Sequence, residues 1–248
     1  MVEISETNKR ERRAPLLGES ALVTGGSRGI GRAIALRLAE LGASVAICGR
    51  EGAALDETLA ALRNMGGRAH AQIADVRHAQ EVSKLLADTE AAIGPLSILV
   101  NNAGVGLFGA VQEQSEADWD RVLNSNLKSV FLVSRAVAPG MMQRGRGDIV
   151  NISSLAGLNA FAGGGIYCAS KWGLQGLTAC MAEDLRGHGI RVSAVCPGSV
   201  ATDFGAGRDK KKPNALCPED VAHAVATIVT QSPGSFVSEI QIRPLKKS

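Results

Sequence analysis

One tyrosine and one lysine have the types and spacing that most directly suggest chemistry. Tyr167 and Lys171 stand four positions apart in the pentapeptide YCASK, so a helix would place them on one face. A tyrosine ordinarily titrates near about 10, and a neighbouring ammonium favours the phenolate and brings that pKa toward the working pH. The pair could exchange a proton with a substrate, or it could be a surface tyrosine leaning on a lysine stem.

A glycine-rich segment, TGGSRGIG at residues 24–31, is the second chemical signal. Glycine lets the backbone approach a pyrophosphate, and a following helix N-terminus supplies N–H donors and a positive dipole. The spacing is GxxxGxG rather than the general GxGxxG, and turns use glycine in any case. Its position between a predicted strand and a predicted helix nevertheless indicates a nucleotide site. The residues predicted to contact the cofactor here are Gly25, Ser27, Arg28, Gly29, Ile30 and Gly31.

Two arginines bear on which dinucleotide binds. An NAD site is expected to carry Asp or Glu about 20 residues after the glycines, whereas here the second predicted strand ends in CGR, at Arg50. Arg28 is a second guanidinium within reach, and two such groups suit a 2′-phosphate better than a bare ribose. Glu51 is interpreted as part of the next helix's first turn. We predict NADP(H) rather than NAD(H), the alternative being that both arginines are solvated surface residues.

Short β-rich runs alternate with amphipathic segments of helical length from Ser20 onward. The predicted strands are 21–25, 44–48, 69–74, 96–102, 147–153, 190–197 and 235–242. The predicted helices are 29–41, 51–65, 78–93, 115–144, 167–186 and 218–230, with a kink or helix end at Pro139. Most strands are almost continuously apolar, as expected when helices cover both faces of a sheet. This alternation predicts an α/β fold, a Rossmann-type doubly wound parallel sheet of seven strands forming one domain over residues 16–248.

The residues that look chemical rather than structural all follow the carboxyl ends of predicted strands, where such sheets bind ligands. They are 24–31, Arg50, Asp75, 102–104, Ser153 with Ser154, and Pro197 with Gly198. Their convergence on one rim of the sheet is a stronger indication than any single motif.

Composition narrows the class of protein. Of 248 residues, 45% are hydrophobic and 21% charged, and a net charge of +3 is too small to indicate nucleic-acid binding. No apolar run approaches the roughly 20 residues that span a bilayer, and the N-terminus lacks the apolar region of a signal peptide. The five cysteines are odd in number and lack metal spacing, so we expect buried free thiols and no metal. These features predict a cytoplasmic protein with no membrane or nucleic-acid partner.

Two polar segments are predicted to be disordered. The first is the tail at residues 1–15, whose KRERR cluster is interpreted as solvated, with a nucleic-acid or membrane contact as the less favoured alternative. The second is GAGRDKKKPNA, residues 205–215. Its three lysines, Lys210–Lys212, could meet an acidic carrier protein or substrate, although a solvated loop is the preferred interpretation.

Taken together, the motifs resemble those of classical short-chain dehydrogenases/reductases. TGGSRGIG, NNAG (101–104), Asn126 in NSNLKSVF, ISS (152–154), YCASK and PGSVAT (197–202) occur in that family's order, over about 17–229. The chain is most similar to 3-oxoacyl-acyl-carrier-protein reductases of fatty acid biosynthesis, a label that relatives with other substrates also carry. The resemblance implies NADP(H)-dependent reduction of a ketone to a secondary alcohol. The ketone would be a small molecule or bound to a carrier, for example a 3-oxoacyl thioester. It also implies a homodimer or homotetramer packed through 126–142 and 167–186.

The resemblance further implies a catalytic set of Asn126, Ser154, Tyr167 and Lys171. Tyr167 would be the general acid in reduction, and Lys171 would tune it and bind the nicotinamide ribose. Ser154 would hydrogen-bond the substrate oxygen; it is chosen over Ser153 because the family's serine precedes the tyrosine by thirteen positions (167 − 154 = 13). Asn126 would hold a water in a proton relay behind Lys171. Singly, each polar residue could be a turn, helix-interior or surface residue.

Further cofactor contacts are implied on both sides of the pocket. On the adenosine side they are Asp75, Val76, Asn102, Ala103 and Gly104; around the nicotinamide carboxamide they are Pro197, Gly198, Val200 and Thr202. Asp75 could equally cap the helix that follows it. Trp172 is interpreted as a core or subunit-interface residue rather than a substrate contact.

Two departures from the family pattern leave the substrate open. The loop between Thr202 and Glu219 is short, and the chain ends SFVSEIQIRPLKKS without the frequent glycine-rich finish. A reductase of a pterin, sugar or steroid-like ketone is therefore an alternative. So is a catalytically idle NADP-binding protein, although the intact set of four residues argues against it.

Overall fold

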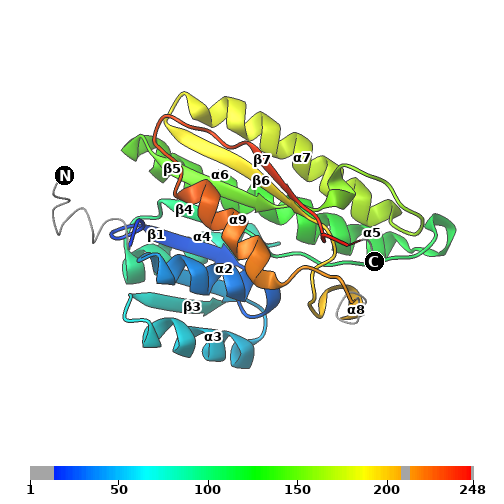
Figure 1. Cartoon of the computed structure of the whole chain (residues 1–248), viewed down its shortest axis with the longest axis horizontal. Helices are drawn as coiled ribbons and strands as arrows, with labels where there is room; N and C mark the ends of the chain where they lie inside the picture. The colour runs from blue at the N-terminus through cyan, green and yellow to red at the C-terminus, as the bar shows by residue number, and fades with distance from the viewer. Residues whose placement is uncertain (1–13, 208–212, 247–248) are drawn as a thin grey trace.

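Seven parallel strands form one sheet through the middle of the protein, with helices on both faces (Figure 1). The strands are β1 (Ser20–Thr24), β2 (Ser44–Gly49), β3 (Ala69–Ile73), β4 (Ile98–Asn101), β5 (Gly147–Ile152), β6 (Ile190–Pro197) and β7 (Glu239–Ile242). Their spatial order is β3-β2-β1-β4-β5-β6-β7, and every neighbouring pair is parallel. The computed structural model describes residues 14–207 and 213–246. The predicted single-domain, doubly wound α/β sheet is confirmed.

Alternate residues of each strand face opposite sides of the sheet, which gives two hydrophobic cores. The helices are α2 (Gly29–Glu40), α3 (Gly52–Asn64), α4 (Ala79–Ile93), α5 (Glu116–Leu123), α6 (Ser129–Arg144), α7 (Gly165–Arg186), α8 (Phe204–Gly207) and α9 (Pro218–Val229). Val23 packs in the core that includes residues of α2, α3 and α9, and Leu22 in the core that includes residues of α4, α6 and α7. Because both faces are covered, the strands carry apolar residues at successive positions.

The predicted helical stretch 115–144 is built from three pieces. Between α5 and α6 lies a π-helical turn, η2 (Asn124–Lys128). Pro139 does not end the helix, since α6 continues to Arg144 and stops at Gly145, whose φ is +67°. Val137 and Met141 on either side of the proline are buried, and this packing offsets the hydrogen bond that proline cannot donate.

Two expectations about burial are corrected. Cys48, Cys168 and Cys196 are buried as predicted, but Cys180 and Cys217 are exposed. Cys180 lies between the inward-facing positions of α7, and Cys217 is the N-cap residue of α9, so neither thiol is covered. Trp172 is 54% exposed and is therefore not a core residue.

Residues 1–13 and 208–212 fall outside the described part of the chain, so the predictions for the basic tail and for Lys210–Lys212 lie outside it too. At the start of the segment predicted to be disordered, 205–215, residues 205–207 belong instead to α8. At the edge of the predicted tail, Ala14 is described and accepts a backbone hydrogen bond from Leu17. Within the described ranges, no helix is both long and apolar enough to cross a membrane.

Candidate active site

A cleft of about 1020 Å³ opens at the carboxyl ends of the strands, where the sequence placed the ligand site. Nearly all of the predicted site residues line it, from segments spread over most of the chain. They are Gly25, Ser27, Arg28, Gly29, Ile30, Gly31, Arg50, Asp75, Val76, Asn102, Ala103, Gly104, Ser154, Tyr167, Lys171, Pro197, Gly198, Val200 and Thr202. Asn126 is the exception. The convergence on one rim predicted from strand ends is therefore present in the fold.

The glycine turn between β1 and α2 forms one end of this cleft. Gly25 and Gly29 have φ values of +65° and +54°, which residues with a side chain rarely adopt. A Cβ on Gly31 would lie 2.1 Å from the carbonyl oxygen of Gly25, so no other residue fits there. These positions leave bare backbone facing the cleft at a helix N-terminus, which is the arrangement that binds a pyrophosphate.

Asn102 fixes the shape of this turn from the end of β4. Its side-chain amide donates to the carbonyl oxygens of Thr24 and Gly25, at 3.0 and 3.1 Å. The Thr24 hydroxyl in turn accepts from the backbone N–H groups of Asn102 and Ala103, at 3.0 and 3.1 Å. The predicted contact residue Asn102 therefore also holds the glycine turn in place.

Charged side chains gather at the ends of β2 and β3. Arg28 pairs with Glu51 at 3.2 Å, and both side chains are largely exposed. Glu51 is the N-cap residue of α3 rather than part of its first turn. Arg50 also lines the cleft. Three arginines, counting Arg77 described next, outnumber the carboxylates of Glu51 and Asp75 here, so this end has a net positive charge that suits an anionic group such as a 2′-phosphate.

Asp75 holds Arg77 through several hydrogen bonds, including 2.9 Å from the arginine Nε. This pairing lowers the pKa of Asp75 to about 2. The N-cap residue of α4 is His78, so the alternative prediction that Asp75 caps this helix is wrong. Arg77 also lines the cleft, but it was not predicted from the sequence. The only indication in the sequence was that it comes two residues after Asp75.

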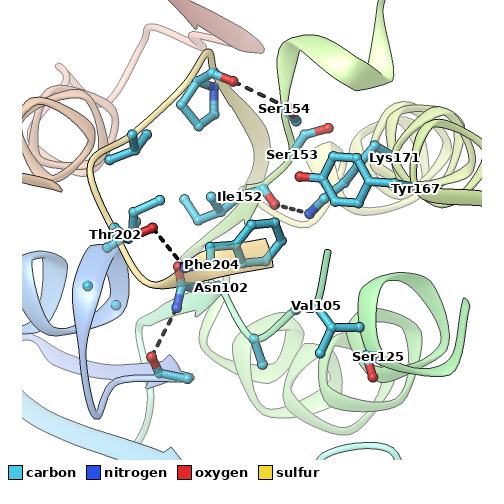
Figure 2. Close-up of a pocket in the computed structure, with 18 of the residues that line it drawn as sticks. Asn102, Val105, Ser125, Ile152, Ser153, Ser154, Tyr167, Lys171, Thr202 and Phe204 are labelled. Carbon is cyan, nitrogen blue, oxygen red and sulfur yellow. Dashed lines mark hydrogen bonds between the residues drawn. The ribbon is translucent and has the colours of Figure 1, made fainter. Parts of the chain in front are cut away.

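Tyr167 and Lys171 lie one turn apart near the start of α7, on the face that meets the sheet. Both side chains are buried, with 8% and 5% exposure. The Lys171 amine donates to the carbonyl oxygen of Ile152 at 2.8 Å and lies 5.9 Å from the centre of the Tyr167 ring (Figure 2). Burial lowers the pKa of Lys171 from 10.5 to about 8. The pair is thus set into the cleft wall rather than resting on the surface.

Ser154 stands beside this pair, just past the end of β5. Its hydroxyl accepts from the backbone N–H of Ala156 at 3.1 Å and lies 3.4 Å from the carbonyl oxygen of Pro197, to which it donates. Ser153 also lines the cleft but is only 3% exposed, whereas Ser154 is partly open. A phenol, a hydroxyl and an amine therefore border one wall of the cleft, with a bare-backbone turn at its far end.

Comparison with known proteins identifies the family. The family model described as short chain dehydrogenase matches residues 19–213. This chain belongs to the short-chain dehydrogenase family.

Relatives with a named activity include a (3R)-3-hydroxyacyl-CoA dehydrogenase of Rattus norvegicus, 40% identical over 86% of this chain and 90% of the relative. A 2-(S)-hydroxypropyl-CoM dehydrogenase 3 of Xanthobacter autotrophicus is 40% identical over 75% of this chain and 73% of the relative. Among solved structures, a metagenomic short-chain oxidoreductase in complex with NADP is 43% identical, with a TM-score of 0.83. That likeness covers 94% of this chain and 99% of the other.

In this short-chain dehydrogenase, Asn126 lies behind the cleft wall rather than in it. The residue is fully buried within η2. Its side chain accepts from the Val105 N–H at 2.8 Å and donates to the Val105 carbonyl at 2.9 Å and the Ser170 hydroxyl at 3.0 Å. Ser170 then donates to the carbonyl oxygen of Tyr167 at 2.7 Å. Asn126 thus ties the segment after β4 to α7, and its predicted hold on a water stays a prediction.

An aromatic wall around Tyr167 was not predicted. Phe108 and Phe204 pack on the tyrosine with ring centres 5.3 and 5.8 Å away, and Phe161 lies 6.0 Å from Phe108. All three line the cleft of the dehydrogenase, as does Arg243 from the C-terminal segment. The chain has only five phenylalanines, and this scarcity was the one feature of the sequence from which a special role for them could have been predicted.

Proposed function

We propose that this short-chain dehydrogenase uses NADP(H) to reduce a ketone to a secondary alcohol, with Tyr167 as the general acid. The observation that carries the proposal is the shared cleft: the Tyr167 phenol and the Ser154 hydroxyl border the same space as the glycine turn. Lys171 is fixed next to the phenol by its bond to the Ile152 carbonyl. A catalytically idle protein would have no need of all these groups at one place.

The residues present fit a dinucleotide phosphate. The turn at Gly25, Gly29 and Gly31 would hold the pyrophosphate, since its positive φ values and close backbone packing need glycine and leave bare N–H groups at the start of α2. Arg28 and Arg50 would bind the 2′-phosphate. The NADP bound to the metagenomic relative supports this choice. When bound, the reduced nicotinamide supplies the hydride.

The chain's own residues handle the proton. The Ser154 hydroxyl turns its single proton from the Pro197 carbonyl to the substrate carbonyl oxygen and stabilises the negative charge that develops there. Tyr167 transfers its phenolic proton to the same oxygen, which completes the alcohol. The phenolate left behind is favoured by the Lys171 ammonium and regains its proton from solvent. In alcohol oxidation, Tyr167 acts in reverse as the general base.

For the substrate, we propose a 3-oxoacyl thioester. The names of the relatives that act on 3-hydroxyacyl-CoA support this choice. Phe108, Phe161 and Phe204 would supply an apolar surface for an acyl chain next to the carbonyl. Reduction of another small ketone, such as a pterin, sugar or steroid-like compound, is the alternative.

For the assembly, we propose a homodimer or homotetramer that packs through 126–142, in η2 and α6, and through 167–186, in α7, with α5 adjoining them. Trp119, Phe131 and Trp172 are exposed large side chains on these elements. A shallow apolar groove between them is lined by Leu123, Leu127, Phe131 and Leu177, among others. Size-exclusion chromatography with light scattering tests this part separately.

The test of function is NADPH oxidation, followed by absorbance, with 3-oxoacyl thioesters and with pterin, sugar and steroid-like ketones. We expect turnover of the thioesters with NADPH and weaker turnover with NADH. If only pterin, sugar or steroid-like ketones are turned over, the proposed substrate is wrong and the proposed reduction of a ketone stands. NADPH binding without turnover of any ketone, and without oxidation of the matching alcohols, would favour the idle protein.

A further inference from the structure

The C-terminal segment contributes a cation to the cleft that the reduction chemistry does not use. Arg243 is the first residue after β7 and lines the cleft. In the register between β6 and β7, Pro197 is paired with Ile242, and the Gly198 N–H donates to the Ile242 carbonyl at 2.8 Å. Arg243 therefore leaves the sheet at the same rim as the catalytic residues, beside the Pro197–Gly198 turn.

The backbone at Arg243 is held on both sides. Pro244 follows it, which restricts Arg243 to extended conformations. A Cβ on Gly198 would lie 3.0 Å from the Pro244 ring and 3.3 Å from the Leu155 side chain, so both pack over this glycine. Leu155 comes directly after Ser154. Leu155, which lines the cleft, is thus an apolar side chain next to both Ser154 and the segment that carries the guanidinium.

The charge of Arg243 is not neutralised by any ion pair within the described ranges. In that part of the chain it donates one hydrogen bond, to the side-chain oxygen of Gln241 at 3.2 Å, which leaves most of its five N–H groups available. Glu239, on the same side of β7, accepts instead from the amides of Gln175 and Gln241. By contrast, Arg28 and Arg77 in the same cleft each pair with a carboxylate.

The strand order separates Arg243 from the arginines proposed to hold the cofactor. β7 is five strands from β2 in the sheet, which at about 4.8 Å per strand is about 24 Å. Arg50 follows β2 and Arg243 follows β7, so the two cannot bind the same phosphate. Tyr167 and Ser154 belong to the elements between these ends. Arg243 is therefore a cation on the far side of the reacting carbonyl from the 2′-phosphate residues.

We propose that Arg243 determines substrate specificity by binding an anionic group of the substrate, a carboxylate or a phosphate, beyond the apolar side chain of Leu155. The substrate is then a ketone with an apolar stretch next to the carbonyl and a negative charge further along. This inference rests on the proposed function, whose carbonyl position it uses. A free oxo acid and the phosphates of a coenzyme A thioester offer the same chemistry from two sources.

The experiment compares matched substrates that differ in the anion. One pair is 4-oxopentanoate and its methyl ester; the other is 3-oxobutanoyl-CoA and the 3-oxobutanoyl thioester of N-acetylcysteamine. The readout is the ratio of kcat/KM for the anionic and the neutral member, with NADPH, in the wild type, Arg243→Ala and Arg243→Lys. The control is Lys246→Ala, which removes an exposed positive charge three residues further on that does not line the cleft. A ratio within one preparation does not depend on the fraction of folded protein.

We expect the wild type to favour the anionic member of one pair, and that pair identifies the source of the anion. A hydrogen-bonded charge pair corresponds to a preference of about tenfold or more. Arg243→Ala should abolish it, Arg243→Lys should keep part of it, Lys246→Ala should keep it, and added salt should weaken it. No preference in either pair, or an equal preference in Arg243→Ala, overturns the proposal.

Failure of the proposed function has a different signature, which is absence of turnover with every member of both pairs. In that case, calorimetry tests whether Arg243 binds an anion. It compares the binding of 4-oxopentanoate and 3-oxobutanoyl-CoA to the NADPH-loaded protein with the binding of their neutral partners. Tighter binding of an anion that is lost in Arg243→Ala supports the anion site without the reaction. Equal binding of anionic and neutral partners, or no binding of either, overturns it.

Discussion

The two ends of the cleft place their polar groups in opposite environments. At the Tyr167 end, Asn126 and Ser170 are fully buried, Lys171 is 5% exposed, and their hydrogen bonds go to protein groups. At the glycine-turn end, the side chains of Arg28 and Glu51 are 63% and 62% exposed. One end is part of the core, whereas the other is bare backbone bordered by solvated charges.

This difference separates the consequences of mutation at the two ends. A buried polar group that loses its partner costs roughly 1–3 kcal/mol, whereas an exposed ion pair contributes about 0–1 kcal/mol. Changes at the Tyr167 end should therefore affect chemistry and folding together, unless they alter only the atom that faces the cleft. Changes to the exposed charged side chains at the glycine-turn end should alter the choice of cofactor and leave folding intact.

Tyr167→Phe is the strictest test of the chemical end, because it removes the reacting oxygen and keeps the ring that packs on Phe108 and Phe204. General acid catalysis contributes about 10²–10⁴-fold, so kcat should fall by about 10³-fold. NADPH affinity, measured by fluorescence titration, should change by no more than a few-fold. Turnover close to that of the wild type would remove Tyr167 from the mechanism.

Lys171 should make the stability of the apo protein depend on pH. Its pKa is 10.5 when solvated and about 8 in the folded state, because burial disfavours the ammonium. Between these values the unfolded chain binds more protons, so the free energy of unfolding rises with pH. The destabilisation is fully present below about pH 8 and is relieved by pH 10.5; it amounts to roughly 3 kcal/mol.

The measurement is urea unfolding, near neutral pH and near pH 10.5, of one protein that keeps Lys171 and one with Lys171→Met. Both proteins carry Tyr167→Phe as well, because Lys171 is proposed to lower the pKa of that tyrosine. The difference between the two then reports on Lys171. The protein that keeps Lys171 should gain roughly 3 kcal/mol relative to the other over this range. Parallel pH profiles would mean that the amine is solvated and that the two ends of the cleft are alike.

Asn126→Ala tests whether the buried network is structural as well as chemical. The substitution leaves the N–H and carbonyl of Val105 and the hydroxyl of Ser170 without their partner. We expect a loss of about 2 kcal/mol in the free energy of unfolding. Asn124→Ala is the matched control, since Asn124 is in the same π-helical turn, is only half-buried and makes no side-chain hydrogen bond within the described part of the chain. Equal effects of the two substitutions would contradict the assigned role of Asn126.

Strand boundaries and the position of the site depend on local sequence patterns, and the sequence predicted both closely. The fifth strand, expected at 147–153, is found at Gly147–Ile152, because apolar runs between turn residues are a property of neighbouring residues. The rim of the sheet followed from the same pattern, since parallel strands bring their carboxyl ends together. Every predicted site residue that comes directly after a strand lines the cleft.

What could not be predicted depends on contacts between distant segments. Asn126 lies in a stretch of helical pattern, and this pattern does not show which polar side chain points into the protein. The π-helical turn η2 determines the direction of the Asn126 side chain. Phe108, Phe161 and Phe204 come from three separate segments and meet only through tertiary structure. Arg243 follows a short last strand, and only its pairing with β6 brings it to the cleft.

The smallest effect is expected at the glycine-turn end, from Glu51→Gln. The Glu51 carboxylate holds Arg28 at 3.2 Å and would compete with a 2′-phosphate for it. A neutral amide competes less, so the Kd of NADPH should fall by up to about fivefold, and less so at high salt because both groups are exposed. The Kd of NADH, which has no 2′-phosphate, should stay unchanged, and so should the urea unfolding midpoint.

Glu57→Gln is the matched control, the same exchange at an exposed position of α3 that does not line the cleft. If Glu57→Gln improves NADPH binding equally, the effect is one of net charge and Arg28 is not a specific contact. If Glu51→Gln instead lowers the unfolding midpoint, the pair contributes to the fold, and the contrast between the two ends of the cleft fails where it should be clearest. An improvement confined to Glu51→Gln and to NADPH would place the choice of cofactor in solvated charges, which can change without disturbing the buried residues that carry the chemistry.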